Sequence, residues 1–203
     1  MLIYANSLTG TPVLSMQAAG AIGQIYSPIV DPDTLKIIAF YLVGSEVARE
    51  TNILDVKSIR EHSQYGIVID SADELVAKDD VVKISKVIDL NFALPGLKVE
   101  TRKGTKLGRV VDFTVTSEDY VVQQIVVKRP LVKSFLDPEL IIPRREIVEI
   151  TDYKVIVKDE EKIIRERALK EDFVPNFVNP FRKTEQPAHA KVRSQTPADK
   201  DIE

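Results

Sequence analysis

The stretch from Leu107 to Lys128 constrains the fold more than any other part of the chain. Two runs rich in Val, Ile, Phe and Thr flank the polar segment Thr116 to Asp119, a composition typical of two β-strands joined by a short turn. The same pattern occurs 85 residues earlier, with these matches: Ile22 to Ile25 with Leu107 to Val110, and Leu35 to Leu42 with Tyr120 to Val127. The chain is therefore predicted to contain a duplicated, strand-built unit.

The rest of each unit is repeated at a slightly different separation. Ile141 to Ile147 and Tyr153 to Val157 match segments that lie 88 residues earlier. The difference of three residues is expected in a loop, because loops absorb insertions most easily, and Leu131 to Pro138 is the longer of the two equivalent loops. Closely spaced glycines, such as Gly20 and Gly23, predict a bulge or tight bend in each unit.

The duplication divides the 203 residues into two domains of roughly 80 residues each. We expect a first domain over 1–77, a linker over 78–90 and a second domain over 91–172. Apolar residues at helical spacing favour a helix in the linker, and acids followed by bases favour another from Asp159 to Lys170. Residues 173–203 are rich in proline and charge, which predicts a largely disordered tail.

Composition excludes several classes of protein. The apolar share of 44% and the charged share of 29% are those of an ordinary globular protein. Because cysteine is absent, a disulfide framework and a thiolate metal site are both excluded. The first cationic residue is Lys36, so the chain begins without the charged segment of a signal peptide. The longest uncharged apolar run, Ile37 to Val43, is far short of the ~20 residues that a spanning helix needs. We therefore expect a cytoplasmic protein without membrane insertion.

The order of glycines, apolar strands and turn residues resembles that of the PRC-barrel family. In the second unit the resemblance rests on Leu94, Gly96, Val99, Gly104 to Val110, Glu118, Asp119, Val121 to Val127, Leu140 to Pro143, Ile147 and Tyr153 to Val157. In the first unit it rests on Leu8, Gly10, Val13, Gly20 to Ile25 and Asp31 to Asp33, with Asp55 at the position of Pro143. Together these residues extend over roughly 1–75 and 91–160.

This family is named for the cytoplasmic H subunit of photosynthetic reaction centres, and it includes the C-terminal domain of a ribosome maturation factor. The resemblance implies small β-barrels that act as adaptors, and it supplies no catalytic motif. The expected fold class is therefore all-β, with two tandem small PRC-like barrels, short helices and a disordered C-terminal tail. The expected function is that of a non-catalytic protein-interaction adaptor. The alternative is an RNA- or ribosome-associated factor for rRNA processing or assembly.

No set of residues points to catalysis. His62 and His189 are the only histidines, and Ser58 and Ser63 near His62 do not make a triad by spacing on one turn. We therefore interpret His62 as a surface histidine. The acidic run from Asp70 to Asp80 lacks the alternating spacing of a calcium loop, which favours a solvated turn and helix start. We expect no enzyme activity, cofactor, metal site or small-molecule substrate.

Charge is shared unevenly between the two units. Residues 1–90 carry a net charge of −5, whereas 98–145 carry +4. The ten bases between residues 98 and 145 are Lys98, Arg102, Lys103, Lys106, Arg109, Lys128, Arg129, Lys133, Arg144 and Arg145. If they share a face, that face could meet RNA phosphates or an acidic protein. Aromatic residues do not interleave with these bases, which disfavours single-strand binding, and an ordinary solvated surface is the third interpretation.

Three phenylalanines lie four residues apart at the start of the predicted tail. Either they cover apolar surface on the second unit, or they form a short linear motif for a partner. The candidate partner-binding residues are therefore Arg102, Lys103, Lys106, Arg109, Arg144, Arg145, Phe173, Phe177 and Phe181.

Overall fold

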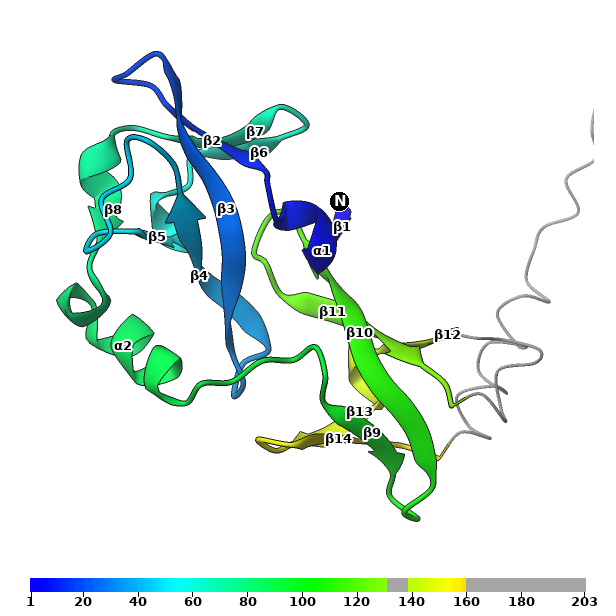
Figure 1. Cartoon of the computed structure of the whole chain (residues 1–203). Coiled ribbons are helices and arrows are strands. Elements are labelled where there is room, and N and C mark those ends of the chain that lie inside the picture. Colours follow the sequence, from blue (N-terminus) through cyan, green and yellow to red (C-terminus); the bar gives the residue numbers. More distant parts are fainter. Residues whose placement is uncertain (131–138, 160–203) are drawn as a thin grey trace, which may run out of the picture.

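The computed structural model describes residues 1–130 and 139–159, and these residues form two seven-stranded sheets (Figure 1). The sheets are curled and form a half-barrel, and helices are few and short within these described residues. The all-β prediction is thus confirmed. The tail from 173, most of the helix predicted from Asp159 to Lys170, and the longer loop lie outside the described residues.

The first sheet is built from residues of the predicted first unit. Its strands are β2 (Pro12–Ser15), β3 (Gly20–Asp31), β4 (Lys36–Val43), β5 (Ile53–Asp55), β6 (Glu61–Ser63), β7 (Gly66–Ile69) and β8 (Leu75–Val76), in the spatial order β6-β7-β2-β3-β4-β5-β8. Short helices connect or extend them: α1 (Ala5–Leu8), η1 (Val56–Ser58), η2 (Ala72–Glu74) and η3 (Lys78–Asp80).

The second sheet has the spatial order β12-β11-β10-β9-β14-β13. Its strands are β9 (Lys98–Thr101), β10 (Lys106–Thr116), β11 (Val122–Lys128), β12 (Glu139–Pro143), β13 (Ile147–Ile150) and β14 (Lys154–Val157), with η5 (Arg144–Glu146) after β12. The N-terminal strand β1 (Leu2–Tyr4) also joins this sheet, because it pairs with β10. The chain therefore starts on the second sheet and then enters the first.

The two sheets repeat one topology. The order β5-β4-β3-β2-β7-β6 in the first corresponds strand by strand to β12-β11-β10-β9-β14-β13 in the second. Each contains one parallel pair at the equivalent place, β2 with β7 and β9 with β14. The duplicated sequence pattern therefore corresponds to a duplicated strand arrangement, and we call the two halves the first and second repeats.

The glycine of the repeated motif marks the predicted irregularity. Gly108 has φ +149°, and a Cβ at this position would collide with the carbonyl of Lys128 on β11. The pairing of β10 with β9 shifts register at this glycine. A side chain is also excluded at the equivalent Gly23, since an added Cβ would lie 2.7 Å from the carbonyl oxygen of Val43. Two strands therefore approach closely where only glycine fits.

The two repeats meet through their hairpin turns. Leu35 and Tyr120 hold equivalent turn positions, and both have positive φ, 50° and 55°. The amide of Ile37 donates to the carbonyl of Tyr120 at 3.0 Å, and the amide of Val122 donates to the carbonyl of Leu35 at 2.9 Å. Because each bond is the counterpart of the other, the repeats are related like the subunits of a two-fold symmetric dimer.

One hydrophobic core extends through both repeats. The rings of Tyr120 and Phe40 of β4 pack in a T-shaped arrangement, with centroids 5.4 Å apart and an interplanar angle of 74°. Leu8 of α1 is 1% exposed and belongs to the same cluster of buried residues. The hairpin of each repeat thus contributes apolar surface to a shared interior, and separating the repeats would expose it to water.

The linker contains the helix α2 (Val82–Asp89), inside the segment for which helical spacing predicts one. Its buried residues Ile84 and Val87 pack in a second, smaller cluster with Ile29, Ile38 and Ala39 of the first sheet. The helix therefore lies on that sheet, as Figure 1 shows, at the side away from the second repeat.

Candidate functional site

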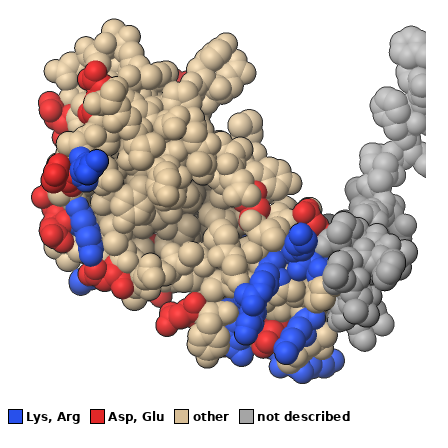
Figure 2. All heavy atoms as spheres, viewed as in Figure 1, with Lys and Arg blue, Asp and Glu red and all other residues tan. Residues whose placement is uncertain are grey.

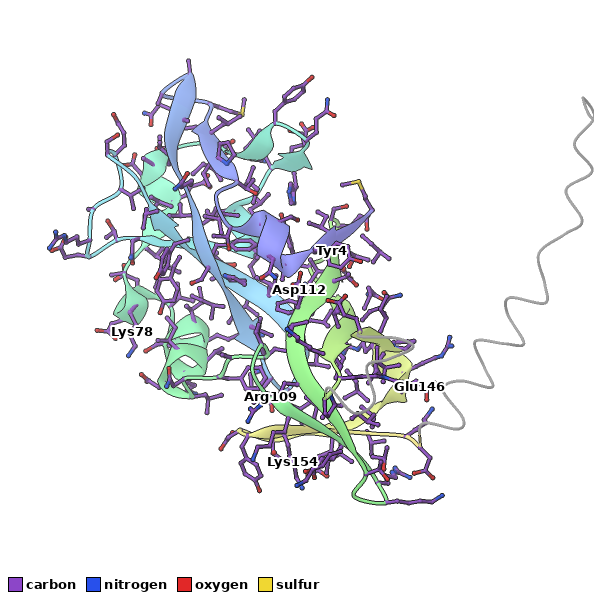
Figure 3. The ribbon with its side chains drawn as sticks, turned by 45° about the vertical axis from the view of Figure 1, so that its right-hand side comes forward. Tyr4, Lys78, Arg109, Asp112, Glu146 and Lys154 are labelled. Carbon is purple, nitrogen blue, oxygen red and sulfur yellow. The ribbon has the colours of Figure 1, made fainter. Side chains whose placement is uncertain are left out.

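A row of cations crosses four neighbouring strands of the second sheet. Lys154 of β14 pairs with Lys98 of β9, Lys98 pairs with Arg109 of β10, and Arg109 pairs with Lys128 of β11. Directly paired residues lie on the same face of a sheet, and like charges in that position destabilise the pairing. We call these four residues the cation row. Figure 3 shows Arg109 and Lys154 toward the same end of the second sheet.

Three members of the cation row, Lys98, Arg109 and Lys128, line a cavity of about 590 Å³, which we call the basic groove. Its described lining residues are Gly96, Lys98, Val99, Glu100, Lys106, Gly108, Arg109, Val110, Val111, Lys128, Arg129 and Pro130. Five of these are cations, and one is a carboxylate. In Figure 2 the blue side chains gather over the second repeat, whereas red ones gather on the side where α2 lies.

Three of the groove cations have no carboxylate partner among the residues that the structure describes. The carboxylate of Glu100 is 3.5 Å from the Nζ of Lys154, so the single acid is already engaged by the cation row. Arg109 donates through Nη1 to the carbonyl of Gly96 at 2.9 Å, which orients its guanidinium without cancelling its charge. Lys98, Lys106 and Lys128 are exposed, and they form no ion pair with any described residue. These three lysines thus bring positive charge without a described carboxylate partner to a groove whose lining is otherwise largely apolar.

The first repeat contains the equivalent groove without the charge. That cavity has a volume of about 360 Å³ and lies between the same strands, β2, β3 and β4. The positions equivalent to Lys98, Lys106, Arg109, Lys128 and Arg129 hold Pro12, Ala21, Gln24, Val43 and Gly44. Since the strand arrangement is the same, the fold does not require cations at this place.

The predicted basic cluster is only partly assembled. Lys106 and Arg109 line the groove, while Arg102 and Lys103 are exposed in the adjoining β9–β10 turn, where Lys103 pairs with Asp159 at 3.1 Å. Lys154, which the sequence interpretation missed, joins through the parallel pairing of β14 with β9. The match between Tyr153 to Val157 and the first unit could have predicted that Lys154 lies on a strand of the same sheet.

Arg144 and Arg145 do not line the groove. Arg144 instead reaches the first repeat, donating to the carbonyl of Thr34 at 2.8 Å and to that of Leu35 at 3.3 Å. Arg145 lies 3.3 Å from the buried carboxylate of Glu146. Both arginines therefore serve contacts within the fold. The remaining candidates, Phe173, Phe177 and Phe181, lie outside the described residues, as does Lys133.

The interpretation of His62 as a surface histidine is wrong. His62 lies half-buried on β6, and its Nδ1 is 2.9 Å from the hydroxyl of Tyr120 in the other repeat. Burial lowers the pKa of His62, because the charged imidazolium loses water there. The neighbouring Ser63 donates to the carbonyl of Gly66, so it stabilises the β6–β7 turn. These side chains hold the fold together and are not arranged as a nucleophile and base.

The acidic segment before α2 also serves local structure. The hydrogen bond from Arg60 lowers the pKa of Asp70, and the two Oδ atoms of Asp70 accept from Arg60 Nε at 2.9 Å. Asp80 accepts from the amide of Ala77 at 2.7 Å, which helps to form the turn before the helix. Within 1–130 and 139–159 no group of three or more ligating side chains is placed to hold a metal ion.

Two further findings bear on function. None of the helices in the described part of the chain is long and apolar enough to cross a membrane. Comparison with protein-family models and with curated proteins found no match. The basic groove is therefore the feature of the described residues that points most directly to a function.

Proposed function

We propose that this chain is a non-catalytic binding protein, an adaptor made of tandem PRC-type barrels that contacts a protein partner through the basic groove. The observation that carries the proposal is the cation row, with Lys98, Arg109 and Lys128 as direct neighbours across three strands. Such neighbours repel one another and weaken the sheet. A binding role accounts for a cluster of like charge that lowers stability, because an anionic partner removes the repulsion when it binds.

The first repeat supports this argument as an internal comparison. Its positions Pro12, Gln24 and Val43 form the equivalent row with the same pairing and no charge. A sheet of this topology is therefore stable with neutral side chains there. The charge distinguishes the second repeat from the first, so we assign the partner to the second.

The alternative function, that of an RNA- or ribosome-associated factor, is favoured by the same cations, since phosphates would also neutralise them. The lining of the groove argues for protein. Its described residues include no aromatic side chain on which a base could stack, whereas single-strand binding proteins commonly use such stacking. Glycine, valine and proline instead offer a surface for an apolar side chain.

Affinity purification from the native cell, followed by mass spectrometry, tests the proposal. The full chain is compared with the double variant Lys106→Glu/Lys128→Glu, in which both changed residues are exposed. The matched control is Lys57→Glu/Lys86→Glu, which changes the net charge equally on exposed residues of the first repeat and linker. We expect a protein recovered with the native chain and the control, and lost with the groove variant. Equal recovery with all three chains would contradict the proposal.

The two alternatives are separated in parallel. Filter binding of an RNA oligonucleotide at several salt concentrations supports the ribosome-associated role only if affinity falls with salt and depends on Lys106 and Lys128. Removing 173–203 tests the segment with the three phenylalanines. Loss of the partner with that deletion, but not with the groove variant, would transfer the binding role from the groove to the tail.

A further inference from the structure

We infer that the basic groove accepts a short, extended acidic segment of a partner protein that also carries at least one large apolar side chain. This inference rests on the proposed function and specifies the chemistry of the partner. The acidic side chains would lie along the cation row, and the apolar side chain would enter the groove beside it.

The spacing of the cation row fits an extended peptide. Neighbouring strands lie about 4.8 Å apart, so the four residues from Lys154 to Lys128 extend over roughly 14 Å of the sheet. A peptide in β conformation advances about 3.3 Å per residue, so about five residues cover the same distance. Because alternate side chains point to the same face, two or three carboxylates of such a segment would face the row.

The apolar requirement follows from the lining. Between the cations the groove presents Val111, Pro130 and the backbone of Gly96 and Gly108, and its volume of about 590 Å³ is within the usual range of ligand pockets. A peptide with acidic side chains alone would leave this apolar lining exposed to water. An apolar side chain would remove it from water, at about 25 cal/mol per Å² buried.

The same lining favours a peptide ligand over a nucleic acid. A sugar-phosphate backbone supplies charge at regular intervals, but it carries no large apolar side chain to place against Val111 and Pro130. Bases of a single strand would need aromatic or planar partners, and among the described lining residues only the two guanidinium groups of Arg109 and Arg129 are planar. An acidic, partly apolar peptide would pair with the cations and also cover the apolar lining of the groove.

Only the second repeat should bind such a segment. In the first repeat the equivalent groove is smaller, about 360 Å³, and the position of Lys106 is occupied by Ala21. Binding should therefore saturate at one peptide per chain, although the fold contains two grooves of the same origin.

A random octapeptide library displayed on phage tests the inference without assuming a sequence. The full chain is the bait, and Lys106→Glu/Lys128→Glu removes peptides that bind elsewhere. We expect enriched peptides to be acidic and to contain a large apolar residue. A synthetic copy of one should bind the native chain one to one by calorimetry, and the groove variant at least ~10-fold more weakly, while Lys57→Glu/Lys86→Glu leaves affinity unchanged.

Amide chemical shifts provide a second readout on the folded, full-length protein. On titration with the peptide, the amides of Val99 and Val110 should move, while those of the equivalent Val13 and Ile25 should not. Shifts centred on the first repeat would overturn the inference, as would enrichment of neutral or basic peptides, or an affinity that ignores Lys106 and Lys128.

The outcomes also separate the inference from the proposed function. If no peptide is enriched but the cellular partner still requires Lys106 and Lys128, the proposed function stands and a short acidic segment is the wrong ligand. If no peptide is enriched and an RNA oligonucleotide binds in a manner dependent on these lysines, both are overturned in favour of nucleic acid. Peptide binding in the absence of any cellular protein partner would retain the inference and remove the adaptor role.

Discussion

The hydroxyl of Tyr120 lies 2.9 Å from the Nδ1 of His62, a residue 58 positions earlier that belongs to the other repeat. The two rings are stacked, with centroids 5.7 Å apart at 14°. Tyr120 stands at the tip of the second hairpin and is only 2% exposed. The tip of one repeat is therefore inserted into the other, and this contact joins the two halves of the chain.

Truncating Tyr120 should loosen the contact between the repeats in two distinguishable steps. We expect Tyr120→Phe to lower the free energy of unfolding by about 0.5–1.5 kcal/mol, because the hydrogen bond to the half-buried His62 is lost while the ring remains. Tyr120→Ala should cost about 3–5 kcal/mol through the cavity it leaves. Urea denaturation measures both. Tyr65→Phe, at a residue 74% exposed, is the control and should be neutral. Equal stability of all three variants would mean that the inserted tip does not hold the repeats together.

The same pair predicts a pH dependence. Burial depresses the pKa of His62 below its ordinary value of 6.5, so between the two values the unfolded chain binds more protons than the folded one. The contribution of His62 is therefore fully present above pH 6.5 and is lost as pH falls toward the depressed value. The unfolding free energy measured at about pH 7.5 and about pH 5.5 should show the loss. Carboxylates titrate in both chains, so the decisive quantity is the difference from His62→Gln. An identical slope in that variant would refute the assignment to His62.

Arg144 should also stabilise the contact between the two repeats. Its guanidinium donates to the carbonyls of Thr34 and Leu35, which lie in the turn of the first hairpin. Replacement by Ala should lower the unfolding free energy by about 1–3 kcal/mol, because bonds from a charged donor are lost. Arg144→Lys keeps the charge but cannot present the planar fork, so it should recover only part of the loss. Full recovery with Lys would show that charge alone is needed.

The glycine of the repeated motif should not tolerate a side chain. In Gly108→Val the new Cβ would collide with the carbonyl of Lys128, and φ +149° is unfavourable for a β-branched residue. We expect a loss of at least about 3 kcal/mol in thermal or urea unfolding. Gly20→Ala is the matched control, because its nearest contact would be 3.8 Å and its backbone is unstrained. An unchanged melting temperature in Gly108→Val would show that the two strands can separate at this point without cost.

Local pattern was enough to predict much of the fold. The hairpin of β10 and β11 was predicted because its apolar residues flank a polar turn, and this pattern depends only on neighbours in sequence. The helix α2 lies where Ile84 and Val87 recur at helical spacing. The site was harder to predict, since Lys106 and Arg109 were candidates on charge alone, whereas Lys154 becomes their neighbour only through a parallel pairing across 56 residues.

Residue types and their spacing were sufficient to predict the strand-rich units, their duplication at separations of 85 and 88 residues, and the uneven charge between them. These properties follow from residue type and short-range periodicity. The structure was needed to show that the two hairpin turns meet between the repeats, that His62 contacts Tyr120, and that four cations align across the second sheet. Those relationships depend on which strands pair over long distances, and pairing is selected by the burial of the whole core, a property that no single segment carries.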